Sequence, residues 1–247
     1  MLSKILLSLG LLPVLLSGAT HPARHADPGQ GYALVELYTS EGCSSCPPAD
    51  ELAATLPKSY PSGVYLLSFH VDYWDRLGWK DPFSNAEYTR RQKEYNTALV
   101  PMLNSIFTPQ VIINGKMEML GADEPRIRAA IDSELAHTVN PVFDAAAHST
   151  GNNFVVVDYA LAGKSAGEFR AALVQVQAST AVKNGENAGK QLHHADIVRD
   201  LKSSGKKTGS LKLTLPAGLT PTDCKVVVFL QDKENLHIGG AHMLDIH

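Results

Sequence analysis

Basic stretches, long apolar runs and cysteines are all scarce in this sequence. The net charge is −3 and no block of Lys and Arg occurs, which argues against a nucleic-acid-binding surface. The apolar run Ile5–Leu16 is too short to span a bilayer comfortably. With 247 residues and an ordinary apolar content, the chain has room for one large or two ordinary domains with a real core.

The three cysteines are Cys43, Cys46 and Cys224, and this small number excludes several kinds of site. No His follows Cys46, so c-type haem attachment is ruled out. A tetrahedral zinc site would need a second ligand pair, and Cys224 stands alone and far away in the sequence. Because Cys224 begins a strongly apolar run, we expect it to be a buried core thiol and not a third redox centre.

The stretch Val35–Asp50 carries the clearest chemical signal. A strand-like apolar run leads through a Gly turn to Cys43 and Cys46, and then to what looks like a helix start. The partial positive charge of a helix N-terminus favours a thiolate, so Cys43 is the candidate nucleophile. Cys46, three residues on, is close enough to resolve a mixed disulfide. An inert structural disulfide is the alternative, although so small a loop constrains little chain entropy.

The first residues have the pattern of a targeting segment. A short basic start precedes the apolar run, and Ser17-Gly18-Ala19 fits a small-x-small cleavage site. We therefore expect a signal peptide over residues 1–19, a loose linker over 20–31, and a periplasmic or secreted protein. In an oxidising compartment the cysteine pair should rest as a disulfide unless something reduces it.

Hydrophobic periodicity predicts alternating strands and helices as far as residue 140. The helix before Leu99 should begin with a capping box formed by Ser84 and Glu87. The expected elements are a strand at 33–38, a helix from 47 or 48 to about 57, a strand at 64–70, a helix up to 99, an Asn-Gly hairpin over 109–120 and a helix from 123 to 135.

After Asn140-Pro141 the pattern changes to short strands divided by Gly- and Asn-rich turns. The strand-like segments are 154–159, 169–178, 211–215 and 225–231. Several strands without intervening helices suggest a β-sandwich, so we expect a second domain over 141–247. If His193 and His194 lie in a strand, they face opposite sides of it and could not easily share a metal.

The order of elements over Tyr32–His137 resembles the thioredoxin fold, with Cys-x-x-Cys after the first strand and Thr108-Pro109 before the third. The expected fold class is therefore an α/β thioredoxin-like fold over 32–140, with a mixed central sheet flanked by helices, followed by a C-terminal all-β sandwich-like domain. The resemblance implies that Pro109 is a cis proline beside the cysteines. It also implies that Thr108 offers backbone groups to a bound peptide.

The same resemblance gives Glu36 a role. Thioredoxins carry a buried Asp six residues before the first cysteine, and one extra loop residue would bring Glu36 into that register. Glu36 would then accept a proton from Cys46, with a raised pKa if it is buried. The alternative is an ordinary strand residue that faces solvent.

Three motifs together are similar to a narrower family of exported bacterial thioredoxin-like proteins that is catalogued as a domain of unknown function. These motifs are Glu36–Asp50, His70–Phe83 and Thr108–Val111. The resemblance implies a fold and a compartment, and it leaves the substrate open.

The segment His70–Phe83 holds both tryptophans of the chain and lies just past a predicted strand. Such loops often contact ligands, and Trp and Tyr anchor partners efficiently. We therefore expect a substrate groove or lid beside the cysteines, formed by His70, Tyr73, Trp74 and Trp79. An ordered packing loop is one alternative. A metal site formed by His70, Asp72 and Asp75 is a weaker one, because the spacing matches no closed site.

The sequence thus favours an exported thiol–disulfide oxidoreductase acting on protein or small-molecule thiols and disulfides. It would need no dissociable cofactor, since the dithiol is itself the redox group, and a membrane redox partner is a candidate for re-setting the pair. The alternatives are a non-catalytic thioredoxin-like binding protein with a structural disulfide, and thiol-based handling of a metal.

Overall fold

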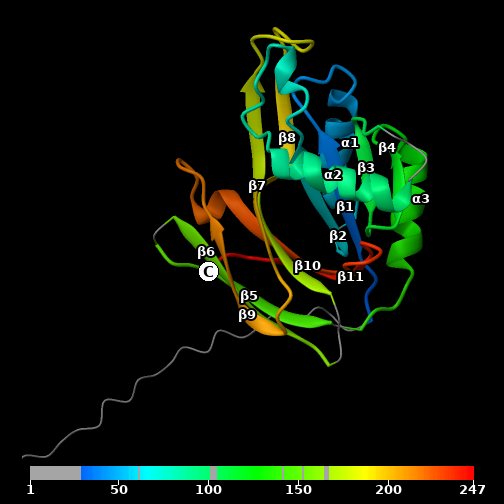
Figure 1. The fold of residues 1–247 in the computed structure, drawn as a ribbon, viewed down its shortest axis with the longest axis vertical. Coiled ribbons are helices and arrows are strands. Elements are labelled where there is room, and N and C mark those ends of the chain that lie inside the picture. The colour runs from blue at the N-terminus through cyan, green and yellow to red at the C-terminus, as the bar shows by residue number, and fades with distance from the viewer. Residues whose placement is uncertain (1–28, 61, 101–104, 141, 152, 164–166) are drawn as a thin grey trace, which may run out of the picture.

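The computed structural model describes residues 29–60, 62–100, 105–140, 142–151, 153–163 and 167–247. The expected signal peptide and most of the expected linker therefore lie outside the described residues. The described chain is a mixed α/β structure with a large mixed sheet and few helices (Figure 1). The large sheet has eight strands in the order β11-β10-β7-β8-β2-β1-β3-β4, and a second sheet has the order β5-β6-β9.

The elements before residue 140 follow the predicted order. They are β1 (Ala33–Thr39), α1 (Pro47–Ser59), β2 (Val64–His70), α2 (Ala86–Leu99), β3 (Gln110–Ile113), β4 (Met117–Leu120) and α3 (Glu124–Leu135). Strand β1 runs parallel to β2 and antiparallel to β3. Asn114 and Gly115 both have positive φ and close the predicted β3–β4 hairpin, as an Asn-Gly turn should.

Alternate residues of β1 face opposite layers, and this places the helices. Val35 and Leu37 pack with apolar residues of α1 and α3, whereas Leu34 and Tyr38 pack with Tyr88 and other residues on the α2 side. Helices α1 and α3 therefore cover one face of the sheet, and α2 covers the other (Figure 1).

The start of α2 differs from the predicted capping box. Asn85 is the N-cap, and its side-chain oxygen accepts a hydrogen bond from the Glu87 amide at 2.9 Å. Ser84 instead donates its hydroxyl to the Asp75 carboxylate at 2.7 Å. The prediction was therefore wrong by one residue, because Asn85 has the extended backbone that an N-cap requires.

The chain after residue 140 is built mainly of strands. They are β5 (Phe143–Ser149), β6 (Phe154–Leu161), β7 (Glu168–Ala181), β8 (Gln191–Ser204), β9 (Thr208–Thr214), β10 (Cys224–Gln231) and β11 (Ile238–Leu244). The three-stranded sheet packs on β7 and β10 through one apolar core that includes Val157, Phe169, Leu213 and Val228. Strands β7, β8, β10 and β11 nevertheless belong to the large sheet, so that sheet runs across the proposed boundary at residue 140.

A buried ion pair links β1 to α2. The Arg91 guanidinium donates to both carboxylate oxygens of Glu36, at 2.7 and 2.9 Å, and the Tyr95 hydroxyl donates to the same carboxylate at 2.6 Å. Gln231 of β10 accepts from Arg91 at 2.9 Å. Arg91 and Glu36 are almost fully buried, so water cannot solvate either charge if its partner is lost.

Removing one partner of this pair should therefore be costly. Arg91→Met should lower the free energy of unfolding by about 3–5 kcal/mol, because it leaves the Glu36 carboxylate buried without its cation. Arg90→Met is the matched control, since the exposed Arg90 pairs with surface carboxylates, and it should cost less than about 1 kcal/mol. Urea unfolding measures both, and equal losses would contradict the role given to Arg91.

Candidate functional site

Cys43 and Cys46 form a disulfide at the N-terminus of α1, with Cα atoms 5.4 Å apart. Cys46 is the N-cap, and its carbonyl accepts the amides of Ala49 and Asp50. Pro47 and Pro48 occupy the first turn of the helix, where a missing amide hydrogen costs little. Both cysteines are fully buried, whereas the two serines between them are exposed.

The Thr108–Pro109 peptide bond is cis, as the sequence resemblance implied. The Cys43 sulfur lies 3.9 Å from the Thr108 carbonyl oxygen, so this bond adjoins the disulfide. Gly121 permits Pro109 to pack close to α1, because a Cβ there would come within 2.7 Å of the Pro109 ring and 3.1 Å of Ala49 on α1. The backbone before Pro109 is therefore held against the cysteine loop.

Both tryptophans of the segment between β2 and α2 bind this region. The Trp74 indole donates to the Thr108 hydroxyl at 2.8 Å, and the Trp79 indole donates to the Glu41 carboxylate at 2.7 Å. Tyr73 lies beside Trp74, with ring centroids 6.3 Å apart. Trp74 also packs closely on Gly42, where a Cβ would lie 3.0 Å from the Trp74 Cβ. Three of the four residues expected to form a groove therefore lie around the cysteine loop.

The prediction for His70, the fourth of these residues, is wrong. His70 has no exposed surface, and its Nδ1 lies 2.7 Å from the Asp81 carboxylate, so it cannot form a wall of a substrate groove. Asp72 accepts a hydrogen bond from Thr89, and Asp75 accepts from Ser84. Within the described ranges, no group of three or more His, Cys, Asp or Glu side chains could hold a metal ion.

A buried polar cluster lies behind the cysteine loop, formed by Glu41, His70, Asp81 and His194. The Glu41 amide donates to Asp81 at 2.8 Å, and Glu41 Oε1 lies 3.0 Å from His194 Nε2. The His70 and His194 rings meet edge to face at 4.8 Å. Burial alone would raise the pKa of Asp81, but His70 and two backbone amides lower it below its ordinary value.

Asp50, one helical turn after Cys46, is a further buried acid near the cysteine loop. Residues four apart lie on the same side of a helix, so Asp50 shares the inner side of α1 with Cys46. Burial raises the pKa of Asp50 to about 7, against a smaller opposing effect of His194. Near neutral pH this carboxyl can therefore either hold or release a proton.

Glu36 does not have the predicted role. Its carboxylate lies on the α2 side of β1, the face opposite α1, and both oxygens are engaged by Arg91 and Tyr95. The alternative of a solvent-facing residue is also wrong, because Glu36 is fully buried. Asp50, which the sequence gave no special reason to select, is a buried carboxyl on the side of α1 that Cys46 shares.

The remaining sequence candidates lie where their residue types suggested. His193 is exposed and His194 is buried on β8, so the two face opposite sides as predicted. Cys224 is a buried thiol in the core between the sheets, and burial raises its pKa to about 11.

The turn between β7 and β8 supplies further residues that sequence reasoning missed. The Asn187 amide donates to the carbonyls of Glu41 and Cys43, both at 2.9 Å. Glu186 accepts from the Ser44 amide at 3.0 Å. The separation of more than 140 residues left no local signal of these contacts. The long β7–β8 hairpin therefore reaches the end of the molecule that carries the disulfide (Figure 1).

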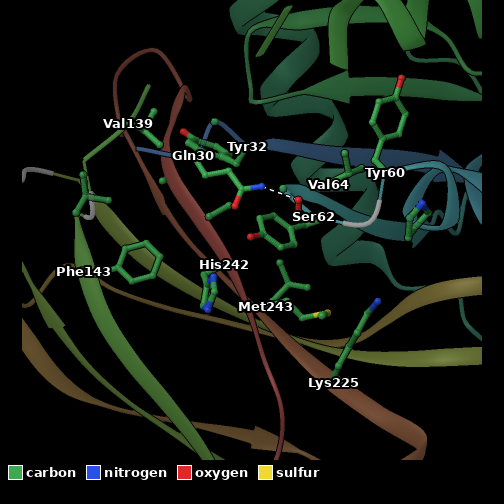
Figure 2. A pocket seen from close by; sticks show the side chains of 18 of the residues that line it. Gln30, Tyr32, Tyr60, Ser62, Val64, Val139, Phe143, Lys225, His242 and Met243 are labelled. Atoms are coloured by element: carbon green, nitrogen blue, oxygen red, sulfur yellow. Dashed lines mark hydrogen bonds between the residues drawn. The ribbon is translucent and has the colours of Figure 1, made fainter. Parts of the chain in front are cut away.

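A cavity of about 500 Å³ lies at the other end of β1 and β2 (Figure 2). Tyr32, Val64 and Phe143 line it, together with Lys225 and His242, and Gln30 donates to Ser62 at its rim. The cysteine loop contributes nothing to this cavity, so it is separate from the disulfide site. No helix in the part of the chain that the structure describes is long and apolar enough to cross a membrane.

Fold and site thus define a mixed α/β protein with a buried disulfide at a helix start and a cis proline beside it. The chain belongs to the DUF1223 family, described as a protein of unknown function, whose pattern it matches over residues 34–231. It is similar to the crystal structure of protein AGR_C_4864 from Agrobacterium tumefaciens, with 30% identity and a TM-score of 0.64. The match covers 86% of this chain and 93% of that one. No curated protein matches the chain.

The raised pKa of Asp50 should make stability depend on pH. Folding favours the protonated acid, so this contribution is fully present below about pH 4 and is lost as the pH rises through about 7. Asp50→Asn, which mimics the protonated acid, should match the wild type at pH 4 and exceed its free energy of unfolding by up to about 4 kcal/mol at pH 8.

Urea unfolding of the oxidised proteins at pH 4, 6 and 8 measures this difference. Glu51→Gln, on the exposed side of the same helix, is the matched control and should give a difference that is flat with pH. Parallel profiles for wild type and Asp50→Asn would show that Asp50 is not a buried acid of raised pKa.

Proposed function

We propose that this protein is an exported thiol–disulfide oxidoreductase built on a thioredoxin-like unit. The observation that carries the proposal is the placement of the Cys43 sulfur 3.9 Å from the carbonyl of Thr108, next to a cis proline. The order of elements from β1 to α3, with α1 and α3 on one face and α2 on the other, supports the thioredoxin-like assignment.

The chemistry is disulfide exchange. In the reducing direction, the Cys43 thiolate attacks one sulfur of a substrate disulfide, and the other sulfur leaves with the electron pair of the broken bond. The Cys46 thiol then gives its proton to the Asp50 carboxylate and attacks the Cys43 sulfur, releasing the second substrate thiolate. Two protein thiols are oxidised to one disulfide, and one substrate disulfide is reduced to two thiols. The reverse sequence donates a disulfide.

Substrate approach is expected along the edge formed by Thr108. An extended peptide can pair with backbone groups there as a short added strand, which places its cysteine near Cys43. Trp74 and Tyr73 would wall this groove, since Trp74 is hydrogen-bonded to Thr108 and the Tyr73 ring lies beside it. The Trp79 indole donates a hydrogen bond to the Glu41 carboxylate, so Trp79 would hold the cysteine loop in place.

A second function has one observation in its favour. Both cysteines are fully buried in the oxidised protein, which suits a structural disulfide in a non-catalytic binding protein. The two functions differ in access to the reduced thiols. A catalytic pair should be alkylated quickly after mild reduction, and a structural pair should resist both reduction and alkylation.

Export is part of the proposal. It rests on the sequence pattern of residues 1–19, and a disulfide is the expected resting state in an oxidising compartment. The substrates and partners proposed are protein or small-molecule thiols and disulfides, with a membrane redox protein as the candidate that re-sets the pair.

The proposed nucleophile can be tested by substitution. Cys43→Ser should reduce turnover of a protein disulfide such as that of insulin to the uncatalysed rate, because no thiolate remains to attack. Cys46→Ser should instead accumulate a mixed disulfide through Cys43, since the resolving thiol is missing. Turbidity or thiol release measures turnover, and intact-protein mass spectrometry detects the mixed species.

Cys224→Ser is the control, because this thiol lies in the core between the sheets and should be dispensable for turnover. Full activity of Cys43→Ser would refute the proposed function. Slow alkylation of the reduced wild type, together with absent turnover, would favour the structural disulfide instead.

A further inference from the structure

The tip of the β7–β8 hairpin, defined as Val182–Lys190, is fixed on the loop that carries the cysteines. The Asn187 side chain is fully buried and donates to the carbonyls of Glu41 and Cys43. Its oxygen accepts from the Lys190 ammonium at 2.9 Å. Every polar atom of this amide group therefore has a partner, two of them on the cysteine loop, so the contact is a specific attachment.

Glu186, the preceding residue, brings a negative charge to the same loop. Its carboxylate accepts from the Ser44 amide at 3.0 Å, and this amide is covalently bonded to Cys43. The hydrogen bonds from Ser44 lower the pKa of Glu186 below its ordinary value, so the group is an anion at neutral pH. The other carboxylate of the loop, Glu41, is already engaged by Trp79 and His194.

We propose that Glu186 is a positioning residue that lowers the reduction potential of the Cys43–Cys46 pair. The inference rests on the proposed function and deepens it. Backbone amides at a helix start normally stabilise a thiolate, but Glu186 occupies the amide next to Cys43 and adds a like charge. Both effects disfavour the Cys43 thiolate, so the reduced form is less stable relative to the disulfide.

The consequence is a direction of electron flow. In a glutathione buffer, the protein disulfide and two glutathione thiols exchange to give two protein thiols and one glutathione disulfide. Glu186 moves this equilibrium toward the protein disulfide, because it penalises the product dithiol. A reduced pair poised in this way tends to pass its electrons to a substrate disulfide, which assigns the protein to reduction of disulfides.

Glu186→Gln tests the charge while keeping the geometry. Glutamine retains an oxygen that can accept from the Ser44 amide, so the loop can keep its hydrogen bond while the charge is lost. The equilibrium constant for reduction by glutathione should rise by about two- to fivefold, the range for exposed charges. A tenfold change would correspond to about 30 mV. The Cys43 pKa, from alkylation rate against pH, should fall.

Salt separates this electrostatic role from a structural one. At 1 M salt the Debye length is about 3 Å, so the difference between wild type and Glu186→Gln should shrink. Glu234→Gln makes the same charge change in the exposed β10–β11 turn and should leave both quantities unchanged. Asn187→Ala, which frees the tip, should shift the equilibrium in the same direction as Glu186→Gln.

Two results would overturn the inference. One is an equilibrium constant and a Cys43 pKa that are equal in wild type and Glu186→Gln. The other is a difference that persists undiminished at 1 M salt. If either occurs while Cys43→Ser abolishes turnover, the proposed function stands and only the role of Glu186 falls. If the wild-type cysteine pair resists reduction and alkylation in every buffer, both the proposed function and the proposed role of Glu186 are refuted.

Discussion

The pairing of β8 alongside β2 is the contact on which the rest of the structure depends. Ile197 is in register with Ser68, and the Ser68 hydroxyl donates to the Ala195 carbonyl at 2.7 Å. This single parallel junction merges the strands after residue 140 with those before it into one sheet. The junction also places His194 next to Glu41 and the tip of the β7–β8 hairpin next to the cysteine loop. Without this junction, Glu41 would lose one partner and Asn187 would be remote from the disulfide.

The loop between β1 and α1 is consequently held by groups from well-separated parts of the chain. Trp79 and Asp81 come from the segment after β2, His194 comes from β8, and Asn187 comes from the hairpin tip. His70 Nε2 and His194 Nδ1 have no hydrogen-bond partner among the described residues. The other polar groups of the network are paired, and their hydrogen bonds restrict the loop to one geometry. The backbone around Cys43 is therefore held in one conformation by hydrogen bonds with groups outside its own loop.

The sequence predicted local features well and distant ones poorly. The helices, the Asn-Gly hairpin, the cis proline and the buried Cys224 follow from nearby residues or from a resemblance with a known geometry. Strand β8 was missed because its polar residues, including His193 and Asp200, hide the alternation that marks a strand. Glu36 was misassigned because successive residues of a strand face opposite sides of the sheet. A shift of one residue in the alignment with thioredoxin therefore moves a side chain to the other face. The surroundings of Asp50 and Asn187 are formed by residues distant in the sequence, so no local pattern marks either residue.

The anchoring of Trp74 and Trp79 has a spectroscopic consequence. These are the two tryptophans of the whole chain, and both are hydrogen-bonded to the surroundings of the disulfide. Intrinsic tryptophan emission from this protein therefore comes entirely from its candidate site, without background from elsewhere in the fold. Because a neighbouring disulfide quenches indole emission and a dithiol does so less, we expect the emission of the unmodified protein to rise when the pair is reduced. The oxidation state of the pair could then be followed in real time without any label.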